Sequence, residues 1–211
     1  MINRIESDLH KDAVTERVDT HAMDLEVKCS CTLKEFFEGC TKTLPFFRTI
    51  TQGDGLTTAD ERIEKEIEIK PGMKPGTVLR FVGEGNKFPN KLAGDLIVKI
   101  DEEEHESIRR VGDNLIYRHK INLCDALTVA AVEFKTLEGE IIKFRPDDII
   151  TPEFMQVFPG KGMPIYNDDP LSPLMREHDR GDFILKFQIE FPSSLSDEQK
   201  DRLVHVLDDD Q

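Results

Sequence analysis

Apolar and polar residues alternate along several stretches of this chain, which predicts β-strands with one buried face. Leu25, Val27 and Cys29 occupy every second position, and Ile67 and Ile69 alternate with charged residues in the same way. Successive side chains of a strand point to opposite faces, so a period of two places the apolar residues on one face. The charged residues between them then point toward solvent.

One apolar run occurs twice, each time directly after a Gly-Asp turn signal. Residues 94–100 read Gly-Asp-Leu-Ile-Val-Lys-Ile, and residues 181–187 read Gly-Asp-Phe-Ile-Leu-Lys-Phe. Each copy is typical of a buried strand and follows a Gly-x-Gly sequence, at 83–85 and at 160–162. The shared order of features, with loops of different length, predicts a duplicated domain. The predicted fold class is therefore mostly β, with two tandem β-sandwich-like modules of similar topology.

Each module is predicted to contain one short helix. In the first, Thr32 precedes Glu35 by three residues, the spacing of a capping box, and Gly39 is placed to end the helix. Residues 123–129 form the corresponding helix of the second module. The predicted organisation is a charged leader (1–24), a peptide-binding first module (25–108), a second module (109–195) and a terminal helix (196–211).

The terminal helix carries an apolar stripe. Ser196 and Gln199 have the spacing of a capping box, and Leu203, Val206 and Leu207 lie at positions i, i+3 and i+4 on one face. A short helix with such a stripe must bury it. It packs either on the second module or against its symmetry mate in a dimer.

Composition excludes several classes of function. A net charge of −14 makes nucleic acid a poor partner, because phosphate binding requires clustered Lys and Arg. No apolar run approaches the roughly 20 residues that a membrane span needs. The leader has no apolar core of the kind found in signal peptides, so we expect an intracellular, cytoplasmic protein.

The cysteines show no metal-binding or redox spacing. None of Cys29, Cys31, Cys40 and Cys124 forms a Cys-x-x-Cys pair, so a zinc ribbon or a thioredoxin-type site is not expected. Cys29 and Cys31 share one face of a strand, where small buried apolar residues are the simplest interpretation.

We find no motif of an active site. The chain lacks Gly-x-Ser-x-Gly, His-Glu-x-x-His and a phosphate-binding Gly-x-x-x-x-Gly-Lys loop. Each Gly-x-Gly lies between two predicted strands rather than before a helix, so each is interpreted as a turn. We therefore expect a binding protein without a cofactor rather than an enzyme.

Alternate strand positions of the first module suggest a groove that binds an extended peptide. Apolar side chains there would line a groove beside an edge strand, to which a peptide adds as a further strand. Lys42 and Arg48 add positive charge to an otherwise acidic protein. The alternative is that the apolar members are ordinary core residues. The predicted groove residues are Val27, Cys29, Lys42, Leu44, Phe46 and Val98.

Several motifs, in the same order along the chain, resemble those of DnaJ-like (J-domain) co-chaperones of the class without a zinc-binding insert. The similarity covers about Asp24 to Leu207. The motifs are Thr-Leu-Lys-Glu-Phe-Phe-Glu-Gly at 32–39, Lys-Pro-Gly-Met-Lys-Pro-Gly-Thr at 70–77, the segments 105–117 and 136–139, and Pro-Gly-Lys-Gly-Met-Pro at 159–164.

This resemblance implies two β-sandwich-like modules and a C-terminal helix that forms a homodimer through Leu203, Val206 and Leu207. It also implies a first module that holds non-native polypeptide and the acidic C-terminal tail of a DnaK-type heat-shock chaperone, at the groove positions given above. Lys42 would contact the carboxylates of the tail, an interaction that salt weakens. No His-Pro-Asp occurs in the sequence, so this chain alone is not expected to stimulate the ATPase of the partner.

A second interpretation comes from a different functional class. Some relatives are structural dimers of the ciliary radial spoke, and residues 147–150 and 160–164 also suit that branch. The modules would then form a docking scaffold. Co-purification with axonemes rather than with a DnaK-type chaperone would distinguish the two.

Overall fold

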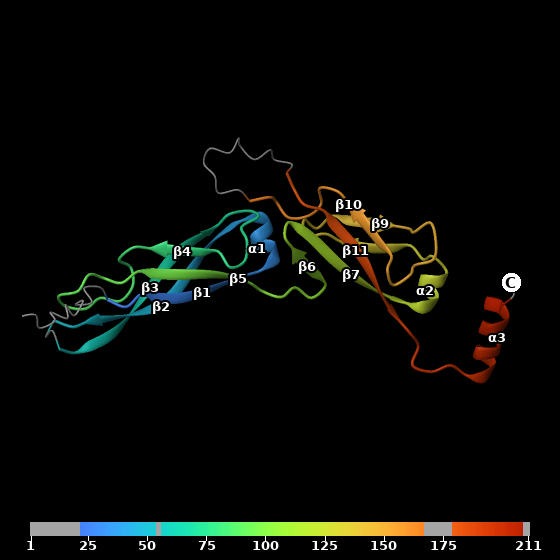
Figure 1. Cartoon of the computed structure of the whole chain (residues 1–211), viewed down its shortest axis with the longest axis horizontal. Helices are drawn as coiled ribbons and strands as arrows, with labels where there is room; N and C mark the ends of the chain where they lie inside the picture. The colour runs from blue at the N-terminus through green and yellow to red at the C-terminus, as the bar shows by residue number, and fades with distance from the viewer. Residues whose placement is uncertain (1–21, 54–55, 167–178, 209–211) are drawn as a thin grey trace, which may run out of the picture. The chain divides into compact units, whose positions relative to one another are not determined.

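The protein is mostly β. The computed structural model describes residues 22–53, 56–166 and 179–208. Within these residues the chain forms eleven strands and three short helices (Figure 1), so the predicted fold class is confirmed. The elements are β1 (Leu25–Cys31), α1 (Leu33–Glu38), β2 (Cys40–Thr51), β3 (Thr58–Ile69), β4 (Val78–Phe81), β5 (Leu96–Glu102), β6 (Ile108–Val111), β7 (Asn114–Asn122), α2 (Leu123–Leu127), β8 (Val132–Lys135), β9 (Ile141–Phe144), β10 (Met155–Phe158), β11 (Phe183–Glu190) and α3 (Asp197–Asp208).

The first repeated strand lies at the centre of a three-stranded sheet. The sheet has the order β1-β5-β4, and β2 and β3 form a separate two-stranded ribbon. Leu96, Val98 and Ile100 of β5 are all at most 1% exposed. Burial of these alternate side chains confirms the buried strand predicted from residues 94–100.

The second repeated strand occupies the same kind of position in a four-stranded sheet of order β10-β11-β7-β6. β11 runs parallel to β7, and the two strands are neighbouring ribbons in Figure 1. Their register places Phe183 beside Leu115. The β8–β9 hairpin adds Phe134, whose ring stacks on that of Phe183 with centroids 5.5 Å apart. This half of the protein therefore has an aromatic core.

The duplication extends to individual hydrogen bonds. In each copy, the Asp of the repeated Gly-Asp pair accepts an N–H through its carbonyl and donates its own N–H to a side chain at the start of a long strand, just before β1 in the first copy and at the first residue of β7 in the second. The bonds are Leu25 N to Asp95 O (2.8 Å) and Asp95 N to Asp24 Oδ1 (2.8 Å), matched by Leu115 N to Asp182 O (2.9 Å) and Asp182 N to Asn114 Oδ1 (2.8 Å).

The chain divides into two compact units. Among the described residues, the first contains 22–27, 45–53, 56–64 and 78–99, and the second contains 28–44, 65–77, 100–166 and 179–208. The module boundary predicted between residues 108 and 109 stays a prediction, and β6 begins at Ile108.

Some elements differ from the expectation. The short strands β6 and β10 were not predicted, and each forms by antiparallel pairing with a longer strand, β7 and β11 respectively. The acidic run at residues 101–106 has the composition of a solvated connector, but its first two residues continue β5 to Glu102. The predicted second helix is shorter, because Val129 adopts a left-handed backbone (φ 55°). The Pro-rich sequence at 167–177 predicts a loop, but this stretch and most of the leader lie outside the described residues.

The predicted terminal helix is confirmed as α3. Its capping box is formed by the Ser196 N–H with Gln199 Oε1 (2.9 Å) and the Gln199 N–H with Ser196 Oγ (3.2 Å). None of its residues is buried. Across the described part of the chain, no helix is both long enough and apolar enough to cross a membrane.

Candidate functional site

The start of α1 holds a carboxylate in a fixed position. The Thr32 hydroxyl accepts the Glu35 N–H (3.2 Å), and Glu35 Oε2 accepts the Thr32 N–H (2.7 Å), which confirms the predicted capping box. The helix is anchored beneath by Leu33, Phe36 and Phe37, all buried. The Glu35 carboxylate therefore occupies one place at the helix start.

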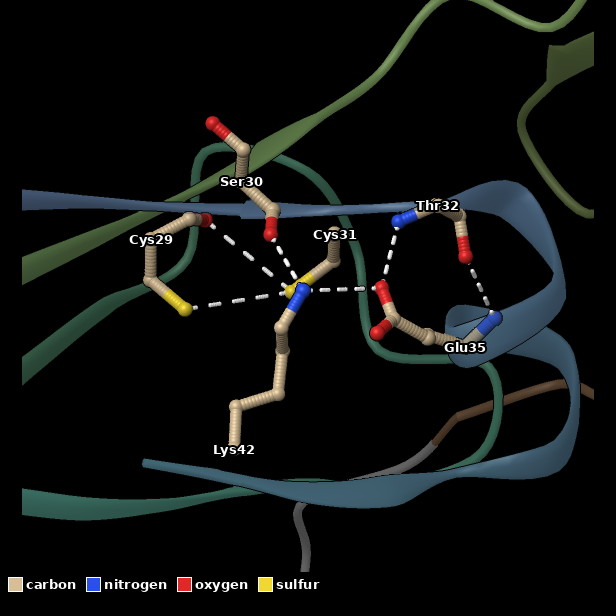
Figure 2. Close-up of polar contacts among 6 residues, drawn as sticks. All are labelled: Cys29, Ser30, Cys31, Thr32, Glu35 and Lys42. Carbon is tan, nitrogen blue, oxygen red and sulfur yellow. Dashed lines mark hydrogen bonds and ion pairs between the residues drawn. The ribbon is translucent and has the colours of Figure 1, made fainter. Parts of the chain in front are cut away.

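Lys42 reaches this carboxylate from β2. Its Nζ donates hydrogen bonds to Glu35 Oε2 (3.0 Å) and to the Ser30 carbonyl oxygen of β1 (2.7 Å), as Figure 2 shows. The two charged side chains are 28% and 29% exposed. α1 directly follows β1 and directly precedes β2, so the three partners converge on one polar cluster, which we call the Lys42 cluster: Ser30, Thr32, Glu35 and Lys42.

The two charges stabilise each other. Burial raises the pKa of Glu35, but the hydrogen bonds from Thr32 and Lys42 outweigh it, and its pKa lies below the ordinary value. Burial likewise lowers the pKa of Lys42. The hydrogen bond to Glu35 and the electrostatic effect of Cys31, Glu35 and Cys29 outweigh burial, so the pKa of Lys42 lies above the ordinary value. Both groups are therefore charged at neutral pH.

Two thiols lie beside the cluster. Cys29 Sγ and Cys31 Sγ are 4.0 Å apart, and both side chains are buried. Burial raises the pKa of Cys31 to about 12, so its thiol is protonated and a weak nucleophile. Among the described residues no three His, Cys, Asp or Glu side chains are grouped to hold a metal ion. The predicted apolar role of this pair fits their burial.

The predicted groove residues fall into both compact units. In the second unit, Lys42 joins the cluster, Cys29 is buried, and Leu44 is half-buried two positions beyond Lys42 on β2. Those of the first unit differ in burial: Val27 is half-buried, whereas Phe46 and Val98 are buried. The three buried residues match the alternative of ordinary core side chains. The groove itself stays a prediction.

Arg48, the second predicted cation, lies in the first unit. Its Nε donates a 2.7 Å hydrogen bond to Glu61 Oε2 on β3. Both basic residues were predicted from the sequence, but neither of their acidic partners was. Each partner depends on how separate elements fold together, which a period of two does not indicate.

Sequence reasoning also missed two arginines that hold α1. The Arg110 guanidinium lies 5.8 Å from the centroid of the Phe36 ring, and that of Arg180 lies 4.7 Å from the Phe37 ring. Arg110 also donates to the Gly72 carbonyl (2.8 Å), and the Gly72 N–H donates to the Phe36 carbonyl (2.7 Å). Cation–π and hydrogen-bond contacts thus fix α1, which carries Glu35, from its buried side.

The apolar stripe of α3 has no cover within the described chain. Leu203, Val206 and Leu207 are 37%, 68% and 61% exposed. Packing on the second module, one of the two alternatives for this helix, does not occur here. The dimer remains as a proposal.

Fold and site together define a β-rich protein with two related modules, each with a capped helix that directly follows a strand, and a polar cluster beside the first of these helices. The family model for the DnaJ C terminal domain matches residues 25–192. The chain belongs to this family, and the predicted resemblance is confirmed.

The relatives include DnaJ subfamily B proteins. The human DnaJ homolog subfamily B member 13 is 34% identical over 83% of this chain and 53% of its own length. DnaJ protein homolog 1 of Drosophila melanogaster is 34% identical over 83% and 50% of the two chains. Protein psi1 of Schizosaccharomyces pombe is 32% identical over 80% and 42%. The chain thus spans about half the length of these curated relatives.

Proposed function

We propose that this chain is a co-chaperone module of the cytoplasm that assists protein folding. It binds non-native polypeptide and the acidic C-terminal tail of a DnaK-type heat-shock chaperone. Membership of the DnaJ C terminal domain family supports the proposal, since the family match covers residues 25–192. Nothing among the described residues favours the radial-spoke scaffold over this function.

The observation that carries the proposal is the position of Lys42. A lysine ammonium has three N–H donors, and the contacts described above use two of them, to Ser30 and Glu35. The side chain is 28% exposed and held in place, so its third N–H is available to a carboxylate from solution. A held cation costs less conformational entropy on binding than a free surface lysine does.

Apolar residues of the proposed groove supply the remaining affinity for the peptide. Leu44 is half-buried and lies on the same face of β2 as Lys42, two positions away. A peptide Leu or Val side chain buried there contributes about 1.5–3 kcal/mol, and association costs offset much of it, so we expect weak binding. The other apolar residues of the proposed groove are Val27, Cys29, Phe46 and Val98.

A fluorescence titration tests this site. A labelled peptide that ends in Glu-Glu-Val-Asp is titrated with the chain at low and at high salt, and again with Lys42→Ala. We expect weak binding that falls with salt and is lost in the variant. Lys34→Ala is the matched control, since Lys34 sits on α1 in an exposed ion pair with Glu38. No binding at millimolar peptide would overturn the tail-binding proposal.

We also propose that α3 forms a homodimer through Leu203, Val206 and Leu207. Two linked sites would bind a client that spans both more tightly than either site alone. Sedimentation equilibrium of a Leu203→Asp/Leu207→Asp variant should show monomers. Val204→Asp introduces the same charge at an exposed position beside the stripe and should leave the dimer largely intact. A monomeric wild-type chain would refute the dimer.

A further inference from the structure

Lys42 already has a carboxylate partner in its own chain. Glu35 Oε2 lies 3.0 Å from Lys42 Nζ, and the two side chains have almost equal exposure, at 29% and 28%. An acidic ligand that approaches the ammonium therefore meets a second negative charge beside it (Figure 2). Repulsion between the two carboxylates acts at short range in a partly buried place, where solvent screens it poorly.

We propose that Glu35 is a built-in competitor for acidic peptides at Lys42 and sets the specificity of this site. It weakens the binding of acidic ligands and leaves the binding of neutral apolar peptides unchanged. The inference rests on the proposed function, because it requires a peptide that binds at Lys42. It adds a residue of opposite charge to a site that the sequence describes only by its cation and its apolar members.

The geometry allows the competitor to give way without loss of structure. Glu35 Oε2 also accepts the Thr32 N–H at 2.7 Å, and Lys42 also donates to the Ser30 carbonyl at 2.7 Å. Each of the two charged groups therefore keeps a second partner in the chain when their mutual bond opens. Partner exchange at Lys42 leaves the cap of α1 closed and the lysine in position.

The charge of Glu35 can be removed while its structural role is kept. Glutamine also completes a capping box, because its side-chain oxygen accepts the same N–H. Glu35→Gln therefore deletes the negative charge and retains the hydrogen bond from Thr32. Glu38→Gln is the matched control: it removes the same charge from the same helix, at a 54% exposed side chain that pairs with Lys34.

The test is a titration of wild type and both variants with two peptides. One ends in Glu-Glu-Val-Asp, and the other is its neutral, amidated Gln-Gln-Val-Asn analogue. We expect Glu35→Gln to bind the acidic peptide about five- to tenfold more tightly, the range of a short-range charge contact, and Glu38→Gln to differ by less than about twofold. Neither variant should change the binding of the neutral analogue.

Two outcomes separate this inference from the proposed function. Acidic peptide that binds wild type and Glu35→Gln equally, and is lost in Lys42→Ala, overturns the competitor while the site stands. Binding that survives Lys42→Ala overturns both. The Lys42→Ala/Glu35→Gln double variant should stay without measurable binding of the acidic peptide, because removal of Glu35 does not replace the ammonium that the peptide carboxylate requires. Thermal unfolding of each variant verifies that the fold is kept.

Discussion

The two modules begin their helices in the same way and then differ. Thr32 caps α1 by accepting the Glu35 N–H (3.2 Å), and Asn122 caps α2 by accepting the Asp125 N–H (2.8 Å). In the first module the N3 carboxylate also binds Lys42. In the second, the Asp125 carboxylate accepts the side-chain amide of Asn122 itself (2.6 Å), so its polar groups are satisfied locally.

The strand after each helix completes the difference. The third residue of β2 is Lys42, partly exposed, whereas the third residue of β8 is Phe134, 4% exposed within the aromatic core. One duplicated scaffold thus presents a held cation in one copy and a packed ring in the other. This difference supports our proposal that the first module binds the acidic ligand, and it places an aromatic core in the second.

The largest expected loss of stability follows truncation of Phe134, a core residue of the second module. Its ring lies 5.3 Å from that of Tyr117, 5.5 Å from Phe183 and 5.8 Å from Phe158 between centroids. Phe134→Ala should lower the free energy of unfolding by about 3–5 kcal/mol, because it leaves a cavity in a packed core. Chemical denaturation measures the loss.

A matched truncation shows whether this loss is due to packing. Phe191→Ala removes the same ring where it is 71% exposed, and should cost well under about 1 kcal/mol. Below its unfolding transition, Phe134→Ala should still bind the acidic peptide. Loss of that binding in a folded variant would break the division of roles between the modules.

The next largest loss of stability is expected from the turn at Gly72, whose N–H donates to the Phe36 carbonyl of α1. Gly72 has a φ of +77°, and a Cβ there would lie 2.2 Å from the Pro164 carbonyl oxygen. Gly72→Ala should therefore destabilise by about 2–3 kcal/mol, more than conformational strain alone. Gly76→Ala, at φ +83° with open space around it, should cost only about 1 kcal/mol. Equal losses in thermal unfolding would contradict the close contact.

The two helix caps should contribute similar, smaller amounts. Thr32→Ala and Asn122→Ala each remove one side-chain acceptor at a helix start. We expect each to lower the free energy of unfolding by about 1 kcal/mol. If Asn122→Ala had no effect in chemical denaturation, the equivalence of the two helix starts would fail.

The features that were predictable from sequence are local. Thr32 and Glu35 are three residues apart, and Leu25, Val27 and Cys29 follow a period of two, so neighbouring residues alone indicate the cap and the strand. The repeated Gly-Asp strand is readable for the same reason. Lys42 could be placed because its strand alternates with the same period.

The features that were not predictable depend on contacts between distant segments. Arg110 lies on the ring of Phe36 and binds the Gly72 carbonyl, partners 74 and 38 positions away. Strand β10 forms through its antiparallel pairing with β11 rather than through a pattern of its own. The bond between Lys42 and Glu35 joins a strand to a helix. None of these contacts leaves a periodic signal in the chain.

The smallest effect is the pH dependence of the Lys42 cluster. Glu35 has a lowered pKa in the folded protein, so its charged form contributes stability that is present above its unfolded pKa and is lost as pH falls through the folded value. Wild type should therefore be more stable than Glu35→Gln at pH 7, by less than about 1 kcal/mol for a partly exposed pair. The difference should shrink below about pH 4, near the ordinary pKa of a Glu side chain. Lys42→Met should reduce the same difference at pH 7, because it removes one of the two donors that keep Glu35 charged. Urea denaturation from pH 7 to pH 3 measures these differences. A constant difference over that range would show that the carboxylate charge does not stabilise the start of α1, and that only the hydrogen-bonded cap, shared with α2, does so.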